Sequence, residues 1–205
     1  MAAYIEIHPE NPQERLLDKV IDRLRDGATV ALPTDSGYAL TCMMNNKRGL
    51  DTIRMIRRVS QKHHFTLLCH DFAQLGQLVI VDNSEFRLIR SLTPGPYTFI
   101  LKATKDVPRM MLHPKKQTVG VRIPDHTIVQ ALLDRLGEPI LSSTLILPDE
   151  EEPLEDGWIV REHLDKQVDV IVEGPSMRGP TSVINFVKGH ISRHGVGNVD
   201  GIFGD

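Results

Sequence analysis

The chain has 205 residues and a net charge of −3, and 40% of its residues are hydrophobic. This length and composition predict one soluble globular domain over residues 1–205, large enough to bury a sizeable core. Its two cysteines, Cys42 and Cys69, lack metal-ligand spacing, which argues against a zinc site or a disulfide framework. No segment approaches the length of a membrane span, and the first residues lack a basic segment followed by an apolar run. We therefore expect a cytoplasmic protein with no membrane partner.

Residues 4–32 predict a strand, a helix and a second strand. Asn11 can cap the helix, Pro12 suits its first turn, and Glu14 stands where a capping box places an acidic residue. Apolar residues then recur at helical spacing until Gly27, which can adopt the left-handed conformation that ends a helix. β-like runs at 4–7 and 29–32 flank this helix.

The rest of the chain alternates helices with strands early and crowds strands together late. Predicted helices occupy 48–59, 84–92 and 127–136, the last closed by Gly137. Predicted strands occupy 65–69, 97–103, 118–123, 139–147, 168–172, 181–187 and 190–193. An acidic run at 148–157 predicts a surface loop that Trp158 anchors to the body. This order predicts an α/β protein with a mixed parallel and antiparallel sheet and helices packed against it.

The first candidate site is a polar turn that follows an apolar strand. Leu32-Pro33-Thr34-Asp35-Ser36-Gly37-Tyr38 begins where the strand from Ala28 to Leu32 ends. Open α/β sheets bind ligands at the carboxyl ends of their strands, so this turn predicts a ligand loop at the edge of the sheet. An ordinary turn uses the same residue types, and both interpretations stay open at this point.

Three later segments accompany this turn. They are residues 93–101 (Thr-Pro-Gly-Pro-Tyr-Thr-Phe-Ile-Leu), 119–126 (Val-Gly-Val-Arg-Ile-Pro-Asp-His) and 180–185 (Pro-Thr-Ser-Val-Ile-Asn). In this order and spacing the segments resemble the YrdC/YciO family, from about Ile7 to the C-terminus, and the chain looks closest to the YciO branch. The resemblance implies the YrdC-like twisted mixed sheet. The best-known members are threonylcarbamoyl-AMP synthases that act in tRNA modification.

The resemblance implies an enzyme similar to an L-threonylcarbamoyladenylate synthase, which uses ATP, threonine and bicarbonate. A carbamate oxygen must attack the α-phosphate, and such a reaction needs positioning and cationic neutralisation more than a side-chain nucleophile. We therefore expect ATP or AMP as a ligand, with Mg²⁺, and a small amino acid as the second substrate. No tightly bound cofactor and no protein metal site are expected.

The resemblance also implies the residues that bind the nucleotide and the amino acid. Thr34 and Ser36 match the family's Pro-Thr-Asp/Glu-Ser/Thr motif, and Asp35 between them is expected to orient the turn by an Asx-type bond. Tyr38 matches an aromatic residue that helps to enclose the amino acid, although simple packing at the start of a strand is an equal alternative.

Arg122 stands at the end of a predicted strand, where its planar guanidinium can bind a phosphate or carboxylate. A pairing with Asp125 that fixes the turn is the alternative. Thr181 and Ser182 match the family's Ser-Thr pair near the nucleotide, and Arg193 lies where relatives carry an arginine beside the ligand cleft. We expect the turn at Thr34, Arg122 and the hydroxyls around Thr181 to converge on one hollow.

The chain departs from the synthase signature at two places. The synthases carry a Lys-x-Arg pair, whereas here Arg57 stands for the lysine and Val59 for the arginine. Their Ser-x-Asn pair falls at Thr144 and Ile146, and an isoleucine cannot supply the donors and acceptor of an amide. Arg57 and Thr144 are the candidate catalytic residues, and the departures argue against full synthase activity.

The alternative function is a module that binds double-stranded RNA or tRNA without synthase activity. A basic stretch supports it, formed by Lys102, Lys105, Arg109, Lys115, Lys116 and Arg122. Such a stretch could follow a phosphate backbone, although a solvated face is the simpler interpretation. His63 and His64, in the loop region that follows Arg57, are expected to be exposed residues without a metal, and contact with a phosphate when they are protonated is the alternative.

Overall fold

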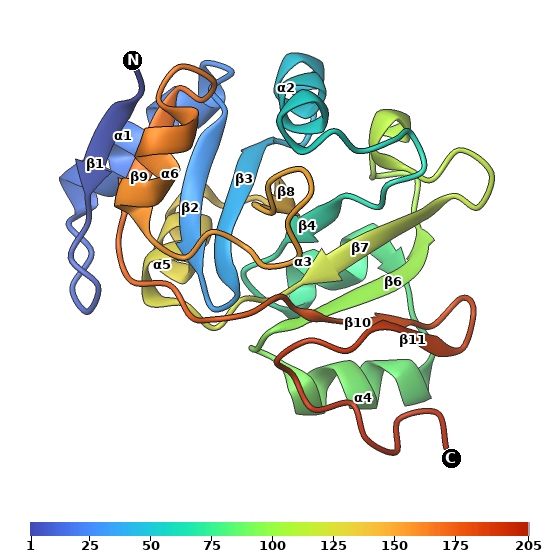
Figure 1. Cartoon of the computed structure of the whole chain (residues 1–205). Helices are drawn as coiled ribbons and strands as arrows, with labels where there is room; N and C mark the ends of the chain where they lie inside the picture. Colours follow the sequence, from blue (N-terminus) through green and yellow to red (C-terminus); the bar gives the residue numbers. More distant parts are fainter. Residues whose placement is uncertain (205) are drawn as a thin grey trace.

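One mixed sheet of 11 strands organises the computed structural model, which describes residues 1–204 (Figure 1). The strands lie in the order β1-β9-β2-β3-β8-β4-β7-β6-β10-β11, and β5 pairs with β6. They are β1 Ala3–Glu6, β2 Val30–Thr34, β3 Gly37–Met43, β4 Thr66–Leu68, β5 Val79–Ile80, β6 Tyr97–Ala103, β7 Thr118–Arg122, β8 Ile140–Thr144, β9 Val170–Glu173, β10 Ser182–Asn185 and β11 His190–Arg193. The helices are α1 Glu14–Arg25, α2 Lys47–Arg57, α3 Phe72–Leu78, α4 Asn83–Leu92, α5 Thr127–Leu136 and α6 Gly157–Leu164, with a 3₁₀ turn at Arg109–Met111.

The expected α/β architecture is confirmed, with parallel and antiparallel neighbours mixed throughout the sheet. β9 runs parallel to both β1 and β2, so the first two strands in the chain are joined through one of the last. β8 runs antiparallel to β3 and to β4, at the centre of the sheet. None of the helices within residues 1–204 is long and apolar enough to cross a membrane.

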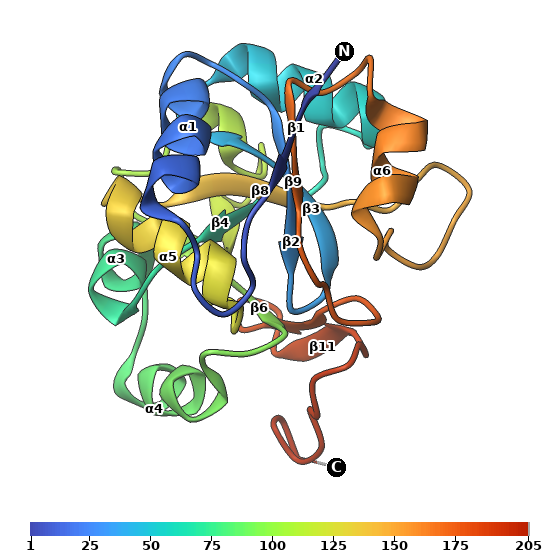
Figure 2. The same ribbon diagram turned by 90° about the vertical axis from the view of Figure 1, so that its left-hand side faces the viewer.

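Hydrophobic cores cover both faces of the sheet. Figure 2 shows α1 and α5 together on one side of the strands and α6 on the other. The apolar stripe of α1, formed by Leu17, Val20, Ile21 and Leu24, packs into the same core as α5, β2 and β9. A second, larger core lies on the opposite face and includes residues of β3, β6 and β7. Cover on both faces explains why β2 and β3 are buried along almost their whole length.

The start of α1 differs from the prediction. The helix begins at Glu14, and Gln13 takes the cap position without a side-chain cap bond. The predicted capping box at Asn11 is wrong because the preceding turn is organised by His8. Its Nδ1 accepts the backbone N–H of Asn11 over 3.0 Å, and the Gln13 side chain accepts the N–H of His8 over 2.9 Å.

The structure contains elements that the sequence pattern did not predict, namely β3, β5, α3, α6 and the 3₁₀ turn. The predicted acidic loop ends at α6, whose N-terminus is capped by the Asp156 carboxylate. Trp158 lies on that helix with 57% of its surface exposed, so its predicted anchoring role is wrong. Leu154 secures the loop instead, because its carbonyl accepts the N–H of Tyr38 over 2.7 Å and its N–H donates to Leu145 over 2.9 Å.

Candidate functional site

A cavity of about 330 Å³ crosses one face of the sheet. Strands β4, β6, β8, β10 and β11 contribute to its wall, together with the end of α2 and the segment that follows it. Its lining residues are Arg57, Lys62, His63, His64, Thr66, Thr98, Ile100, Ser143, Thr144, Thr181, Val183 and Arg193. Within residues 1–204 this lining contains cations and hydroxyls but no carboxylate. In a protein of net charge −3, such a lining favours an anionic ligand.

Strand β7 runs beneath this cavity with a glycine at its middle. Side chains alternate along a strand, so Thr118, Gly120 and Arg122 project toward the same face. A Cβ at Gly120 would lie 2.8 Å from Thr66 Oγ1 and 3.2 Å from Thr98 Cγ2. The missing side chain therefore provides the room that the neighbouring strands enclose.

Arg57 occupies the last turn of α2 and points into the hydroxyl-rich wall. Its Nη1 donates a 2.7 Å hydrogen bond to Ser143 Oγ, and its Nε donates over 3.4 Å to the carbonyl of Ile146. Burial, with a contribution from the Arg193 charge, lowers the pKa of Arg57 to about 10. Arg57 remains cationic at neutral pH while being largely withdrawn from water, which strengthens its interaction with an anion.

His63 lies against Arg57 rather than in solvent, which corrects the expectation for the two histidines. Its Nε2 lies 3.3 Å from Arg57 Nη1 and 3.3 Å from Ser143 Oγ. Burial first, and then the Arg57 charge, lowers the pKa of His63 to about 4, so the ring is neutral at physiological pH. Because Arg57 can only donate, Nε2 must accept and the ring proton is assigned to Nδ1.

Arg193, at the end of β11, forms the opposite wall. Its Nη2 donates over 2.7 Å to Thr181 Oγ1 and its Nε over 2.8 Å to the Thr181 carbonyl, while Thr181 Oγ1 lies 3.0 Å from Thr98 Oγ1. Burial lowers the pKa of Arg193, and the Glu152 carboxylate partly offsets this effect. The charge of Glu152, in the acidic loop, thus acts on one of the cations that line the cavity.

The polar turn at Thr34 is a buried hairpin between β2 and β3. Thr34 Oγ1 closes the turn by accepting the N–H of Ser36 over 3.0 Å and donating to the Gly37 carbonyl over 2.7 Å. The Asp35 carboxylate does not make the expected Asx-type bond within its own turn. The carboxylate bonds the Arg122 guanidinium and accepts the Asp125 N–H over 2.9 Å.

Arg122 is therefore paired with Asp35, and the alternative pairing with the Asp125 side chain is wrong. Both partners are almost completely buried, at 3% and 2% exposure. Burial and the nearby Arg193 charge lower the pKa of Arg122 to about 9. Arg122 Nε and Ser36 Oγ are buried without a hydrogen-bond partner among residues 1–204, so each keeps hydrogen-bonding capacity that no described residue satisfies.

Tyr38 and Ser182 lie in the protein interior rather than on the cavity wall. The Tyr38 hydroxyl donates to the Val172 carbonyl over 2.9 Å, and burial raises the pKa of Tyr38. Ser182 Oγ donates to the Gly197 carbonyl over 2.5 Å and accepts the Gly195 N–H over 3.0 Å. These contacts show how the two side chains stabilise the fold, and their expected ligand contacts stay predictions.

The structure divides the predicted site residues into two groups. Arg57, Thr144, Thr181 and Arg193 line the cavity. Thr34, Ser36, Tyr38, Arg122 and Ser182 are buried beside it. Of the three places expected to converge on one hollow, only Thr181 lines the cavity, whereas the Thr34 turn and Arg122 are buried and are not part of its lining. The cavity lies over a face of the sheet, whereas the sequence interpretation placed it at an edge.

Sequence reasoning missed Ser143, Thr66, Thr98, His63 and Gly120. Two signals could have found some of them. The polar run Ser142-Ser143-Thr144 is unusual in a strand between apolar neighbours, and Gly120 interrupts a β-branched strand, which marks a close approach of other groups. No local sequence pattern predicts that His63 lines the cavity, because its partners Arg57 and Ser143 come from α2 and β8.

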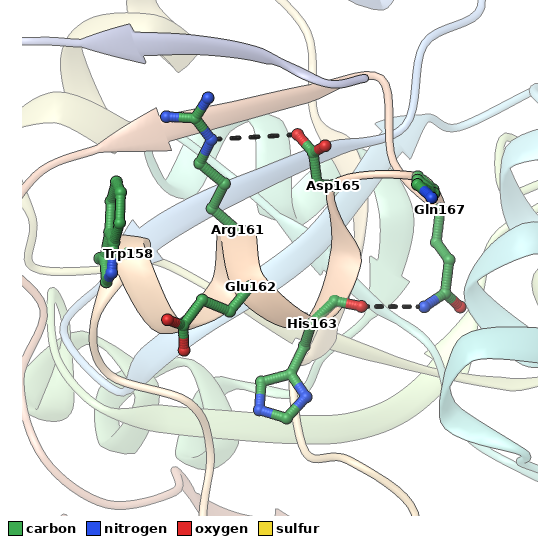
Figure 3. Close-up of a pocket in the computed structure, with 7 residues that line it drawn as sticks. Trp158, Arg161, Glu162, His163, Asp165 and Gln167 are labelled. Atoms are coloured by element: carbon green, nitrogen blue, oxygen red, sulfur yellow. Dashed lines mark hydrogen bonds and ion pairs between the residues drawn. The ribbon is translucent and has the colours of Figure 1, made fainter.

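A second concavity, of about 640 Å³, lies along α6 (Figure 3). Figure 3 shows that its lining comes from that helix and the turn after it, with Arg161 paired to Asp165 over 4.0 Å and Gln167 bonded to the His163 carbonyl. None of the predicted site residues lies there. Within residues 1–204 no cluster of three histidine, cysteine or carboxylate side chains could hold a metal ion.

Comparison with known proteins identifies the family to which this chain belongs. The family model Sua5_yciO_yrdC, described as "Telomere recombination", matches residues 22–195. The chain is 44% identical over 202 residues to the uncharacterised protein YciO of Escherichia coli K12, covering 97% of this chain and 98% of that protein. The chain belongs to the Sua5/YciO/YrdC family.

Members with an assigned activity are more distant. A threonylcarbamoyl-AMP synthase of Coxiella burnetii is 27% identical over 180 residues, covering 86% of this chain and 96% of that protein. Among solved structures, E. coli YciO superposes with a TM-score of 0.94 at 44% identity and covers 98% of both chains. Pyrococcus abyssi Sua5 complexed with L-threonine gives a TM-score of 0.81 at 22% identity, over 91% of this chain and 54% of that one. That similarity establishes the Sua5/YciO/YrdC fold.

Proposed function

We propose that this protein is an ATP-dependent enzyme that joins the carbamate of a small amino acid, with L-threonine as the first candidate, to AMP. The observation that carries the proposal is one cavity lined by two arginines and three hydroxyl side chains. The arginines are Arg57 and Arg193, which are close enough for the Arg193 charge to lower the pKa of Arg57, and the hydroxyls belong to Ser143, Thr144 and Thr181. Its distant synthase relatives and the L-threonine bound to a protein of the same fold support the choice of substrate.

The reaction needs an environment that collects negative charge. The amino group and bicarbonate give a carbamate and water, and a carbamate oxygen then attacks the α-phosphorus of ATP. The bond from that phosphorus to its bridging oxygen breaks, and pyrophosphate leaves with the electron pair. Cations and hydrogen-bond donors fixed in advance stabilise such a transition state without side-chain covalent chemistry.

Each wall of the cavity has a task in this scheme. Arg57, held by Ser143 and Ile146, neutralises the α-phosphate or the carbamate, and Arg193 neutralises the opposite side of the same group. Thr144 donates a hydroxyl toward the reacting groups. Arg122 Nε and Ser36 Oγ, which have no partner among residues 1–204, supply donors beside the cavity for the amino-acid carboxylate. ATP is proposed to enter as its Mg²⁺ complex.

A pyrophosphate-release assay tests the proposal, with ATP, threonine and bicarbonate present together and each omitted in turn. We expect release that depends on all three substrates and falls at least tenfold in Arg193→Ala. Arg90→Ala, which removes an exposed arginine of α4, is the matched control and should keep the parent rate. A rate of pyrophosphate release that is unchanged when threonine or bicarbonate is omitted would show that the protein catalyses a different reaction.

Binding of double-stranded RNA or tRNA remains the second candidate, because most of the predicted basic stretch is exposed. Lys102, Lys105 and Arg109 lie on the surface, as do Lys115 and Lys116, whereas Arg122 is buried with Asp35 and leaves the set. An RNA-binding function requires affinity that falls steeply as salt increases, with no stabilisation by nucleotides.

A further inference from the structure

The proposed reaction releases a proton inside the cavity. The α-amino group of an amino acid is mainly protonated at neutral pH, whereas only its neutral form can attack bicarbonate. The substrate ammonium group must therefore lose one proton before the carbamate forms. A group near the reacting nitrogen has to accept this proton, or the proton has to leave directly to bulk water.

Imidazole is the side chain in the lining that suits this task. Among residues 1–204 the lining has no carboxylate, its arginines and lysine are cations, and its hydroxyls can pass a proton on but not keep it. The two imidazoles of the lining belong to His63 and His64. His64 Nε2 lies 2.8 Å from Thr118 Oγ1 at the start of β7, whereas His63 lies beside Arg57 and Ser143.

The hydrogen bonds around Ser143 provide a path for the proton to His63. Arg57 Nη1 donates to Ser143 Oγ over 2.7 Å, so this oxygen accepts one bond and keeps a second lone pair. His63 Nε2 lies 3.3 Å from the same oxygen and 3.3 Å from Arg57 Nη1. Of these three groups only Nε2 can accept the Ser143 proton. A substrate amine that donates to the free lone pair of Ser143 can therefore pass a proton through the hydroxyl to the ring.

The ring of His63 is held in this orientation by its surroundings. The His63 backbone N–H donates to the Ser60 carbonyl over 3.1 Å. The ring meets the buried ring of Phe65 edge to face, with centroids 5.2 Å apart and planes inclined by 83°. Contact with Phe65 and with Arg57 keeps Nε2 directed toward Ser143.

Bound anions should make His63 a stronger base. Burial lowers the pKa of His63 to about 4, and basic groups from three elements reinforce this shift, namely Arg57 and Arg54 of α2, the adjacent His64, and Arg193 of β11. A phosphate or bicarbonate beside Arg57 and Arg193 offsets their charges, so the pKa of His63 rises toward its ordinary value. Proton uptake is thereby coupled to the presence of anionic substrates in the cavity.

We propose that His63 accepts, through the Ser143 hydroxyl, the proton that the substrate amino group loses before the carbamate forms. This inference rests on the proposed function and deepens it, since it requires an amine as the substrate. The amine proton moves to Ser143 Oγ while the Ser143 proton moves to His63 Nε2. The neutral amine then bonds to the bicarbonate carbon, and hydroxide leaves with a second amine proton as water. His63 returns its proton to solvent when the anionic products leave.

His63→Gln separates proton uptake from a structural role, because the glutamine carbonyl can still accept from Arg57 and Ser143 but takes up no proton. Pyrophosphate release with ATP, threonine and bicarbonate is measured between pH 6.5 and 9.5. We expect kcat/KM of this variant to be at least tenfold below the parent at pH 7 and within about threefold at pH 9.5, where the free amine is abundant. His194→Gln, at an exposed position, should follow the parent at every pH.

Two further measurements test the path of the proton. The double variant His63→Gln, Ser143→Ala should lose no more than about twofold beyond the more damaging single variant, because the two groups act as one unit. Exchange of ¹³C between bicarbonate and the carbamate of threonine, followed by NMR with AMP in place of ATP, reports carbamate formation without adenylation. We expect the parent to accelerate this exchange and His63→Gln to lose at least tenfold of the acceleration.

Two results would overturn the role of His63. They are a parent-like rate in His63→Gln at pH 7, or a loss in that variant that is the same at every pH, which would show that the ring only holds Arg57. If the parent releases no pyrophosphate but accelerates carbamate exchange through His63, the proposed function fails and the role of His63 stands. If the parent releases pyrophosphate and His63→Gln matches it, that role fails and the function stands. A parent chain with neither activity overturns both.

Discussion

The Arg57 guanidinium and the Ser143 hydroxyl, 86 residues apart in the chain, are joined by a 2.7 Å hydrogen bond at the centre of the cavity. Ser143→Ala removes the acceptor that orients this cation. We expect kcat/KM for pyrophosphate release to fall about 10- to 100-fold, with a loss of roughly 1 kcal/mol in stability from the missing bond. Steady-state kinetics and urea unfolding measure the two effects separately, and a parent-like kcat/KM would remove Ser143 from the site.

The Asp35–Arg122 pair should dominate the stability of the hairpin region. Arg122→Ala leaves the Asp35 carboxylate buried and uncompensated, so we expect a loss of roughly 3–5 kcal/mol in the free energy of unfolding. The double variant Asp35→Ala, Arg122→Met removes both charges and should recover a large part of that loss. Chemical denaturation of the parent, Arg122→Ala and the double variant tests this, and a double variant no more stable than Arg122→Ala would contradict a coupled pair.

Stability should depend on pH through His63, and His64 should add to the same effect because burial also lowers its pKa to about 4. The pKa of His63 is about 4 in the folded chain and 6.5 as its ordinary value, so the unfolded chain binds the extra proton between these values. The free energy of unfolding should therefore decrease as pH falls from 6.5 toward 4, by roughly 1–2 kcal/mol after allowance for solvent screening. Above pH 6.5 the contribution is constant.

His63→Gln should flatten this part of the pH profile, while His194→Gln, at an exposed position, should leave it unchanged. Thermal unfolding at half-unit intervals between pH 4 and 7 measures both. A profile with the parent slope in His63→Gln would assign the effect to other groups.

Restoring the synthase residues tests what separates the branches of the family. Ile146→Asn together with Arg57→Lys returns an amide and a lysine to the positions where the synthases carry them. We expect faster pyrophosphate release with threonine and bicarbonate, because the amide adds a polar contact that isoleucine cannot make. An unchanged rate in the double variant would show that these two positions do not set the difference.

A side chain at Gly120, beneath the cavity, should weaken both the stability of the fold and the binding of AMP. Gly120→Ala places a methyl group 2.8 Å from Thr66 Oγ1 and 3.2 Å from the Phe65 carbonyl, so the neighbouring strands must shift. We expect a loss of roughly 1–3 kcal/mol in stability and weaker AMP binding. Gly76→Ala, which meets no atom within 4 Å, is the matched control. Parent-like AMP affinity in Gly120→Ala would place the nucleotide elsewhere.

Local patterns predicted elements whose signals are strong within one segment. The bounds of the last predicted helix, 127–136, and its end at Gly137 agree with the structure, because apolar periodicity and a left-handed glycine act locally. β3 was missed because the polar turn before it hid an apolar strand that begins at Gly37. α6 was missed because acidic residues precede it, although Asp156 is the residue that caps it.

The site was less accessible to sequence reasoning than the fold. Motif matching found Arg57, Thr144, Thr181 and Arg193, which line the cavity. It could not distinguish a side chain that faces the cavity from one buried beside it, because that depends on strand register and on partners such as Asp35 for Arg122. Pairings across the sheet therefore decide which motif residues face the ligand.

The interactions that build the cavity join distant parts of the chain. Arg57 bonds Ser143, Thr98 meets Thr181, and Asp35 bonds Arg122, across 86, 83 and 87 residues of sequence. No fragment confined to one half of the chain can carry all three contacts, so binding competence requires strands from both halves to pair. A bound nucleotide should consequently slow amide hydrogen exchange in strands from both halves of the polypeptide, and ligand protection becomes a measure of global folding.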